Sequence, residues 1–354
     1  KNQKDQRTTA ISQGSSRILK DINIWEELRS KVQPILQILV SEGCKDKNMK
    51  FDHEKINEGP LGFIIDNKFF KKKLFDEIIK SIFISYYDKT EIKEINSSSE
   101  NNRLLITNKG SIEYKVLVAA DGRFSKTRFH ANIKYFYHDY NQNAFVFNIS
   151  HEKKHNGVAL ERFFPEGPMA LLPIRNTKIN KSSVVWTVDS KISDNEIFKR
   201  NFNNEFKRVY KNFFGKIKNF SKIQKYPLNI YHCYDYSKNN IFLIGDACQA
   251  IHPIAGQGFN LGLRDAKCLS KIIYDFKELG LDLNGTNLEQ EYRASRIIDK
   301  TLLIKSTHNL NKLFSSSLKS MAILRSLGLK IFSKSNLLKN QSMIFAMGLR
   351  NLEI

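Results

Sequence analysis

Cysteine is scarce in this sequence, with 4 residues among 354. The thiols are far apart in the chain, at Cys44, Cys233, Cys248 and Cys268. No pair has the CxxC spacing of a metal site, and so few cysteines cannot form the disulfide framework of a small secreted domain. The sequence therefore predicts a reduced, intracellular protein without a metal site.

Long hydrophobic runs are also missing. No run approaches the ~20 apolar residues that a membrane-spanning helix needs, and the first residues do not form a signal peptide. We therefore expect a cytoplasmic protein, and we also consider a peripheral position at the inner face of the membrane.

Acidic residues are few relative to basic ones, 36 against 57, which gives a net charge of +21. The lysines are scattered, with only short clusters such as 71–73, and no stacking aromatics alternate with them. Nucleic-acid binding would concentrate basic residues on one face, so no nucleic-acid partner is predicted. Two interpretations remain: a generally solvated basic surface, which we favour, and attraction to an anionic membrane surface.

The most informative stretch is residues 241–265, IFLIGDACQAIHPIAGQGFNLGLRD. The apolar run 241–244 is typical of a buried parallel strand, and Gly245-Asp246 follow at the strand end where α/β proteins bind ligands. A glycine-containing turn, 252–258, then leads into a helix predicted from Asn260. Such a helix start presents backbone N–H groups to an electron-rich ligand. An ordinary strand–turn–helix crossover explains these residues about equally well.

A second apolar strand runs into Asp121-Gly122 before a helix start. By itself, this pattern fits either a ligand loop or a βα turn with Asp121 as the helix N-cap. The preceding residues 104–107 and 112–119 are expected to pair as strands across the turn 108–110. Near the beginning of the chain, Ser15 or Ser16 is expected to cap a helix, and further on Asn67 is expected to cap another.

Between residues 133 and 236 the apolar residues alternate with a period of two. This pattern is clear at Phe145, Phe147 and Ile149, and it predicts an antiparallel sheet. After residue 266 the pattern becomes helical. A chain of this length accommodates two domains.

Three motifs together resemble the para-hydroxybenzoate-hydroxylase-like flavin monooxygenases, in particular the ubiquinone-biosynthesis hydroxylases. Residues 245–265 are similar to that family's flavin-binding GD motif, and residues 120–128, ADGRFSKTR, to its DG motif. Residues 161–173, ERFFPEGPMALLP, are similar to its substrate-domain signature. Cys248-Gln249 departs from the Ala-His that members usually carry. The resemblance covers essentially residues 5 to 350.

The resemblance implies FAD as cofactor and NAD(P)H as reductant, with no catalytic side chain because the flavin performs the chemistry. The residues that it implies for cofactor binding are Arg7, Asp121, Gly122, Gly245, Asp246, Pro253, Ala255, Gly256, Gln257, Gly258, Asn260 and Leu261.

The implied fold is mixed α/β: a Rossmann-like FAD-binding domain, an inserted antiparallel substrate domain and carboxyl-terminal helices. We expect residues 1–44, 67–130 and 236–285 in the first domain, 45–66 and 131–235 in the second, and 286–354 in the helical region.

The implied function is hydroxylation of the aromatic ring of a polyprenylated phenol in ubiquinone biosynthesis, through a flavin C4a-hydroperoxide. The implied partners are a lipophilic phenolic substrate and a membrane surface or biosynthetic complex. A related flavoprotein with another substrate is an alternative.

The family's initial GxGxxG unit is missing from this chain, which begins with Lys1. We therefore expect a fragment that lacks roughly 30 residues or somewhat more and binds FAD weakly by itself. A further alternative follows, in which the chain is inactive and serves only as a binding subunit.

Overall fold

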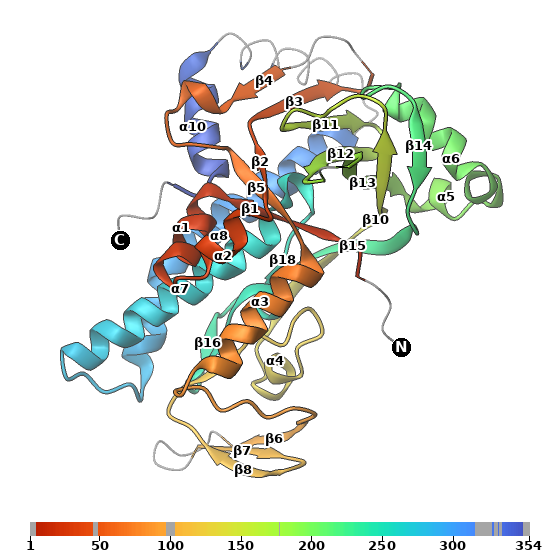
Figure 1. Cartoon of the computed structure of the whole chain (residues 1–354). Coiled ribbons are helices and arrows are strands. Elements are labelled where there is room, and N and C mark those ends of the chain that lie inside the picture. The colour runs from red at the N-terminus through yellow and green to blue at the C-terminus, as the bar shows by residue number, and fades with distance from the viewer. Residues whose placement is uncertain are drawn as a thin grey trace.

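The computed structural model describes residues 5–44, 49–96, 103–176, 178–315, 328, 332 and 335–349. Within these ranges the strands form one large sheet and three small ones, and the long helices α7 and α8 lie side by side (Figure 1). The combination of an antiparallel sheet, a parallel strand pair and helices confirms the predicted mixed α/β fold.

The large sheet is antiparallel except where β11 and β3 pair in parallel. Its order is β18 (Gln249–Ala250), β15 (Gln224–Cys233), β10 (Tyr135–His151), β13 (Asn180–Asp189), β12 (Gly167–Ile174), β11 (Val158–Phe164), β3 (Gln37–Glu42) and β4 (Met49–Asp52), with β14 (Ile217–Phe220) also on β10.

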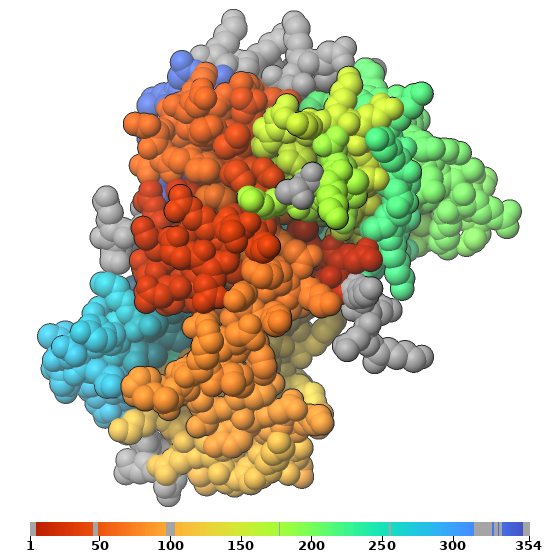
Figure 2. Space-filling view, viewed as in Figure 1, coloured from red at the N-terminus to blue at the C-terminus, as the bar shows by residue number. Residues whose placement is uncertain are grey.

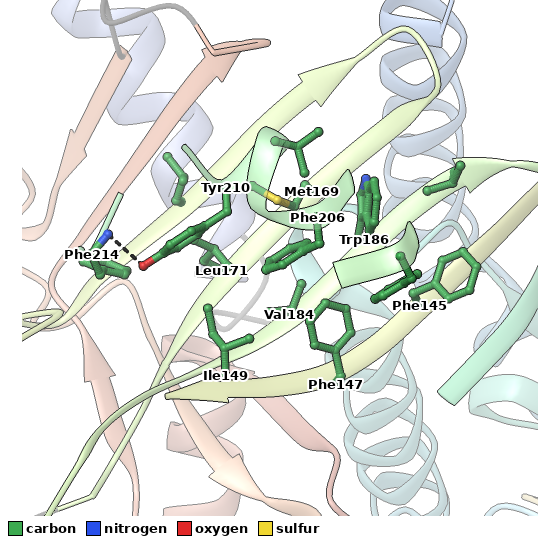
Figure 3. Packing of buried hydrophobic residues seen from close by; sticks show 14 of the residues in the cluster. Phe145, Phe147, Ile149, Met169, Leu171, Val184, Trp186, Phe206, Tyr210 and Phe214 are labelled. Atoms are coloured by element: carbon green, nitrogen blue, oxygen red, sulfur yellow. Dashed lines mark hydrogen bonds between the residues drawn. The ribbon is translucent and has the colours of Figure 1, made fainter. Parts of the chain in front are cut away.

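One face of this sheet carries the predicted alternating aromatics. Phe145 lies opposite Trp186, which lies opposite Met169, so the three side chains share a face. Helices α5 (Ser190–Ser193) and α6 (Glu196–Tyr210) lie beside this sheet, and α6 contributes Phe206 and Tyr210 to the cluster in Figure 3. Successive strand residues point to opposite faces, so the period of two places one apolar set under the helix.

The other face of the large sheet carries smaller side chains and faces the rest of the molecule. Ala170 of β12 pairs with Val185 of β13 and with Glu161 of β11, so these three residues share this second face. Helix α8 (Thr286–Ser315) packs against β11 and β12. The two faces therefore differ: one is filled by large aromatics, and the other leaves space beside small residues.

The small sheets hold the remaining strands. The first has the order β1 (Thr8–Ser12), β5 (Gly62–Asp66), β2 (Gln33–Ile35). The second has the order β16 (Ser237–Lys238), β17 (Ile241–Leu243), β9 (Leu117–Ala119). The third has the order β6 (Ile92–Asn96), β7 (Leu104–Thr107), β8 (Gly110–Glu113). Strands β17 and β9 are parallel. Figure 2 shows the amino-terminal elements over the middle of one face, with the β6–β8 sheet at one end.

The remaining helices and 3₁₀ turns lie between the strands and after them. They are α1 (Gln13–Asp21), α2 (Trp25–Arg29), α3 (Asn67–Lys80), α4 (Lys126–His130), α7 (Gln257–Glu278) and α10 (Asn336–Ala346), with 3₁₀ turns η1 (His53–Lys55), η2 (Gly245–Ala247) and η3 (Ile254–Gly256). None of the helices in the described ranges is long and apolar enough to cross a membrane.

Two local expectations about helix caps were wrong. Helix α1 is capped by Ser12, whose hydroxyl accepts a hydrogen bond from Ser15 N at 3.2 Å, because Ser12 ends β1 in the extended conformation of an N-cap. Helix α3 is capped by Asp66, whereas the Asn67 side chain accepts a hydrogen bond from Thr9.

Two strand and helix boundaries also differ. The strand expected over 112–119 is two strands, because β8 pairs back onto β7 whereas β9 pairs with β17. Helix α7 begins at Gln257 rather than Asn260, since the left-handed Gly256 directs the chain into the helix earlier.

The division into domains stays a prediction. The structure places β3, from the range assigned to the FAD-binding domain, in the large sheet. It places β5, from the range assigned to the substrate domain, beside β1.

Candidate cofactor and substrate site

Two parallel strands bring the two predicted motifs to one edge. Leu243 of β17 is in register with Ala119 of β9, and Ile244 N donates to Ala119 O at 3.1 Å. Because parallel strands end at the same edge of a sheet, Asp121 and Asp246 follow these strands on one side of the molecule.

The GD turn, the 3₁₀ turn Gly245–Ala247 that follows β17, touches helix α7 through two glycines. Gly245 has φ +56°, a conformation that glycine adopts without strain. A Cβ added to Gly262 would lie 2.9 Å from the Cα of Gly245. The backbone of the turn and the backbone of the helix are therefore in direct contact, and this contact sets where Asp246 lies relative to the helix start.

The carboxylate of Asp246 is available to a ligand. Its side chain is exposed, yet enough protein surrounds it that desolvation raises its pKa, with the charge of Arg123 acting in the opposite direction. No described residue donates a hydrogen bond to this carboxylate.

Helix α7 begins directly after a glycine in the left-handed conformation. Gly256, at φ +60°, is its N-cap and makes no side-chain capping bond. The first N–H groups of a helix have no partner within the helix and carry the positive end of its dipole. A Cβ added to Gly258 would have no atom within 4 Å, so space lies beside this first turn.

Polar contacts fix the helix start against the amino-terminal strand. The Asn260 side chain accepts from Ser12 N at 2.8 Å and donates to Ala10 O at 3.1 Å. The Gln257 side chain donates to Ala346 O at 3.0 Å. These two predicted cofactor residues thus hold the turn in place through their side chains.

A buried ionic network supports the same turn from behind. Asp265 is fully buried and accepts from Gly245 N at 3.1 Å and from Arg296 Nε at 2.8 Å. Lys300, also buried, lies 3.2 Å from Asp265 Oδ2 and donates to Cys248 Sγ at 3.2 Å. Burial raises the pKa of the Cys248 thiol, but contact with Cys233 and the nearby Lys300 outweigh this and lower it.

The DG motif is tied to the GD turn by an arginine. Asp121 Oδ2 accepts from Thr127 N at 3.1 Å, whereas the N-cap of α4 is Ser125. Gly122 begins the turn between β9 and α4, and its carbonyl accepts from Ser125 N at 3.1 Å. The buried Arg128 donates to Ala247 O at 2.7 Å, so a hydrogen bond joins the two motifs.

Arg7 stays a prediction as a cofactor contact. Its guanidinium forms a bidentate pair with Asp5, at 2.9 Å from Nε to Oδ1 and from Nη2 to Oδ2. It also lies 5.9 Å from the ring centroid of Tyr226. The preceding Gln6 carbonyl accepts from Asn148 on β10, which places this segment against the large sheet.

Three further predicted residues belong to the same loop and helix. Pro253 is half-buried, Ala255 lies in η3, and Leu261 is buried against Ile251 and Leu303. Leu261 therefore anchors the helix in the core.

A recess lies between this loop and the second face of the large sheet. It is lined by Glu161, Pro168, Ala170, Val185, Thr187, His252, Pro253 and Ile254. Burial lowers the pKa of His252 to about 3, with His308 contributing, so this imidazole is neutral at pH 7. The recess thus combines mostly small or apolar walls with one carboxyl group.

These features fit the flavin half of FAD. Asp246 offers an acceptor for polyol hydroxyls, the α7 start offers donors, and Gly258 leaves room for a flat ring beside the helix. Within the described ranges, no group of three His, Cys, Asp or Glu side chains could hold a metal ion.

Three charged residues contribute to this region although they are not among the predicted site residues: Glu161, Arg128 and Asp265. For Glu161 the available signal was a charged pair, with Arg162, inside a strand that is otherwise apolar. The role of a charged side chain depends on the residues that contact it, and for these three those residues are distant in the chain.

Comparison with solved structures identifies the fold class. The structure is similar to the crystal structure of p-nitrophenol 4-monooxygenase PnpA from Pseudomonas putida, with a TM-score of 0.81 and 15% identity, covering 99% of this chain and 90% of that one. It is also similar to PqsL, a probable FAD-dependent monooxygenase from Pseudomonas aeruginosa, with a TM-score of 0.76 and 16% identity, covering 93% and 90%. The fold is that of a flavin-dependent monooxygenase.

Sequence comparison is more specific. The model of a family described as an FAD binding domain matches residues 1–278. Ubiquinone hydroxylase UbiL of Rhodospirillum rubrum is 30% identical over 346 residues, which are 97% of this chain and 80% of that protein. The 3-demethoxyubiquinol 3-hydroxylase of Escherichia coli is 24% identical over 351 residues, covering 98% and 88%. The chain belongs to the ubiquinone-biosynthesis hydroxylase family of FAD-dependent monooxygenases.

Proposed function

We propose that this protein hydroxylates the aromatic ring of a polyprenylated phenol in ubiquinone biosynthesis, with FAD as cofactor and NAD(P)H as its reductant. The observation that carries the proposal is the recess in which the loop 252–254 meets the second face of the large sheet. A cofactor held by Asp246 and the α7 start and a substrate held on the sheet would meet there.

The residues on each side of the recess have different roles. Asp246 accepts hydrogen bonds from ribityl hydroxyls, and the N–H groups at the start of α7 meet the electron-rich edge of the flavin. When bound and reduced, FAD supplies activation of O₂ and transfer of an oxygen atom to the ring. Pro168, Ala170 and Val185 give the sheet side of the recess an apolar lining, and apolar surroundings keep water away from reacting atoms.

The partners and location extend this proposal. The substrate is a lipophilic phenol, which is reached most readily at a membrane surface. The net charge of +21 supports a cytoplasmic protein that associates with the anionic inner face of the membrane or with a biosynthetic complex there.

The test is turnover of FAD-loaded protein with NADH or NADPH, O₂ and a prenylated phenol. Mass spectrometry should find a product that has gained one oxygen atom, and labelled O₂ should supply that atom. Consumption of NAD(P)H that yields hydrogen peroxide but no hydroxylated phenol would contradict the proposal.

A further inference from the structure

Glu161 occupies an unusual position in strand β11. It is in register with Ala170 of β12 and Val40 of β3, so its side chain lies on the second face of the large sheet and lines the recess. The next residue, Arg162, points to the opposite face. Its guanidinium donates to Val209 O at 2.7 Å and Tyr210 O at 3.1 Å at the end of α6. The two neighbouring charges are therefore separated by the sheet.

No described residue donates a hydrogen bond to the Glu161 carboxylate. The side chain is partly accessible through the recess, while protein surrounds it closely enough that desolvation raises its pKa to about 7. A carboxylate taken out of water without a donor is costly. On the wall of the recess, the carboxylate faces the space from which a donor outside the protein reaches it.

The groups that face Glu161 do not supply that donor. His252 is the other titratable side chain among the described residues that line the recess, and burial keeps it neutral at pH 7. Helix α8 presents Leu313 and Phe314 to this face, beside Val40 of β3. The surroundings of the carboxylate are thus mostly apolar, as a flat ring with a single polar substituent requires.

We propose that Glu161 accepts a hydrogen bond from the ring hydroxyl of the phenolic substrate and thereby sets which way the ring lies in the recess. This inference rests on the proposed function. A hydrogen bond to an ionised acceptor is stronger than one between neutral groups, and it shifts electron density from the hydroxyl toward the ring. Glu161 would therefore select phenols over ring ethers and favour attack on the ring by an electrophilic oxygen.

The experiment compares two ligands of nearly the same shape, 2-prenylphenol and its methyl ether, which lacks the donor hydrogen. Their binding to FAD-loaded protein is measured by calorimetry between pH 5 and pH 9. At pH 8 the parent should bind the phenol roughly 10- to 100-fold more tightly than the ether, the range for hydrogen bonds to charged groups. Glu161→Gln should reduce this preference about tenfold.

Glu166→Gln is the matched control, because Glu166 is an exposed carboxylate in the same hairpin. It should keep the full preference. In the parent, the preference should also shrink as the pH falls through about 7, because protonation removes the charge, and this measurement needs no variant.

Two outcomes overturn the inference. If the parent prefers the phenol and Glu161→Gln retains that preference at all pH values, this inference fails while the proposed function stands. If neither ligand binds to the parent or to Glu166→Gln, the proposed function fails, and this inference fails with it.

Discussion

We expect flavin binding to depend on Asp246 more than on any other single residue. Its carboxylate has no described donor, and the turn that carries it contacts α7 at Gly262. We expect Asp246→Ala to weaken FAD binding by about 1–3 kcal/mol, the range for a hydrogen bond to a charged group. Flavin fluorescence titration against the parent measures this change.

Glu278→Ala is the control for that variant, since Glu278 is an exposed carboxylate at the other end of α7. It should bind FAD as the parent does, and circular dichroism should find all three proteins equally folded. Equal FAD affinity of Asp246→Ala and the parent would mean that the GD turn is only a crossover between a strand and a helix.

At the scale of elements, the contact between the GD turn and α7 sets the geometry of the site. We expect Gly262→Ala to destabilise the protein by about 1–3 kcal/mol, because its new Cβ would lie 2.9 Å from the Cα of Gly245 and the backbones must separate. Thermal unfolding followed by circular dichroism checks this expectation.

Gly258→Ala provides the comparison within the same helix. Its added Cβ has no atom within 4 Å, so folding should be unaffected or improved, by up to about 1 kcal/mol from helix propensity. The larger Gly258→Val should weaken FAD binding without unfolding the large sheet, which has its own core. Equal stability of Gly262→Ala and the parent would refute the close contact.

At the scale of the whole molecule, the buried ionic network joins the GD turn to both long helices. Asp265 lies on α7, and Arg296 and Lys300 lie on α8. We expect Asp265→Asn to cost about 3–5 kcal/mol of unfolding free energy, because it leaves the buried Lys300 without a carboxylate partner and takes from Arg296 one of its two. Urea denaturation measures the loss.

Asp21→Asn is the matched control for this change. Asp21 also pairs with a residue of α7, Lys267 at 2.9 Å, but both side chains are largely in contact with water. Its loss should cost no more than about 1 kcal/mol. Similar losses for the two variants would show that burial does not set the strength of the network.

Local patterns in the sequence determined a large part of this architecture. The period of two at Phe145, Phe147 and Ile149 was enough to predict the antiparallel sheet and its buried face. The apolar run that ends at Asp246 was enough to predict a parallel strand, although not that its partner is the strand before Asp121. Both features follow from short-range rules, in which side-chain alternation and strand ends decide what is buried and what meets a ligand.

Tertiary structure alone decided which distant segments meet. Residues 112–119 divide between two sheets, β3 joins the large sheet in parallel with β11, and Asp265 meets cations from another helix. The orientation of Glu161 toward the recess also depends on these long-range pairings. A strand's own residues fix its alternation but not its neighbour, because pairing energy depends on cross-strand contacts that a single segment does not contain.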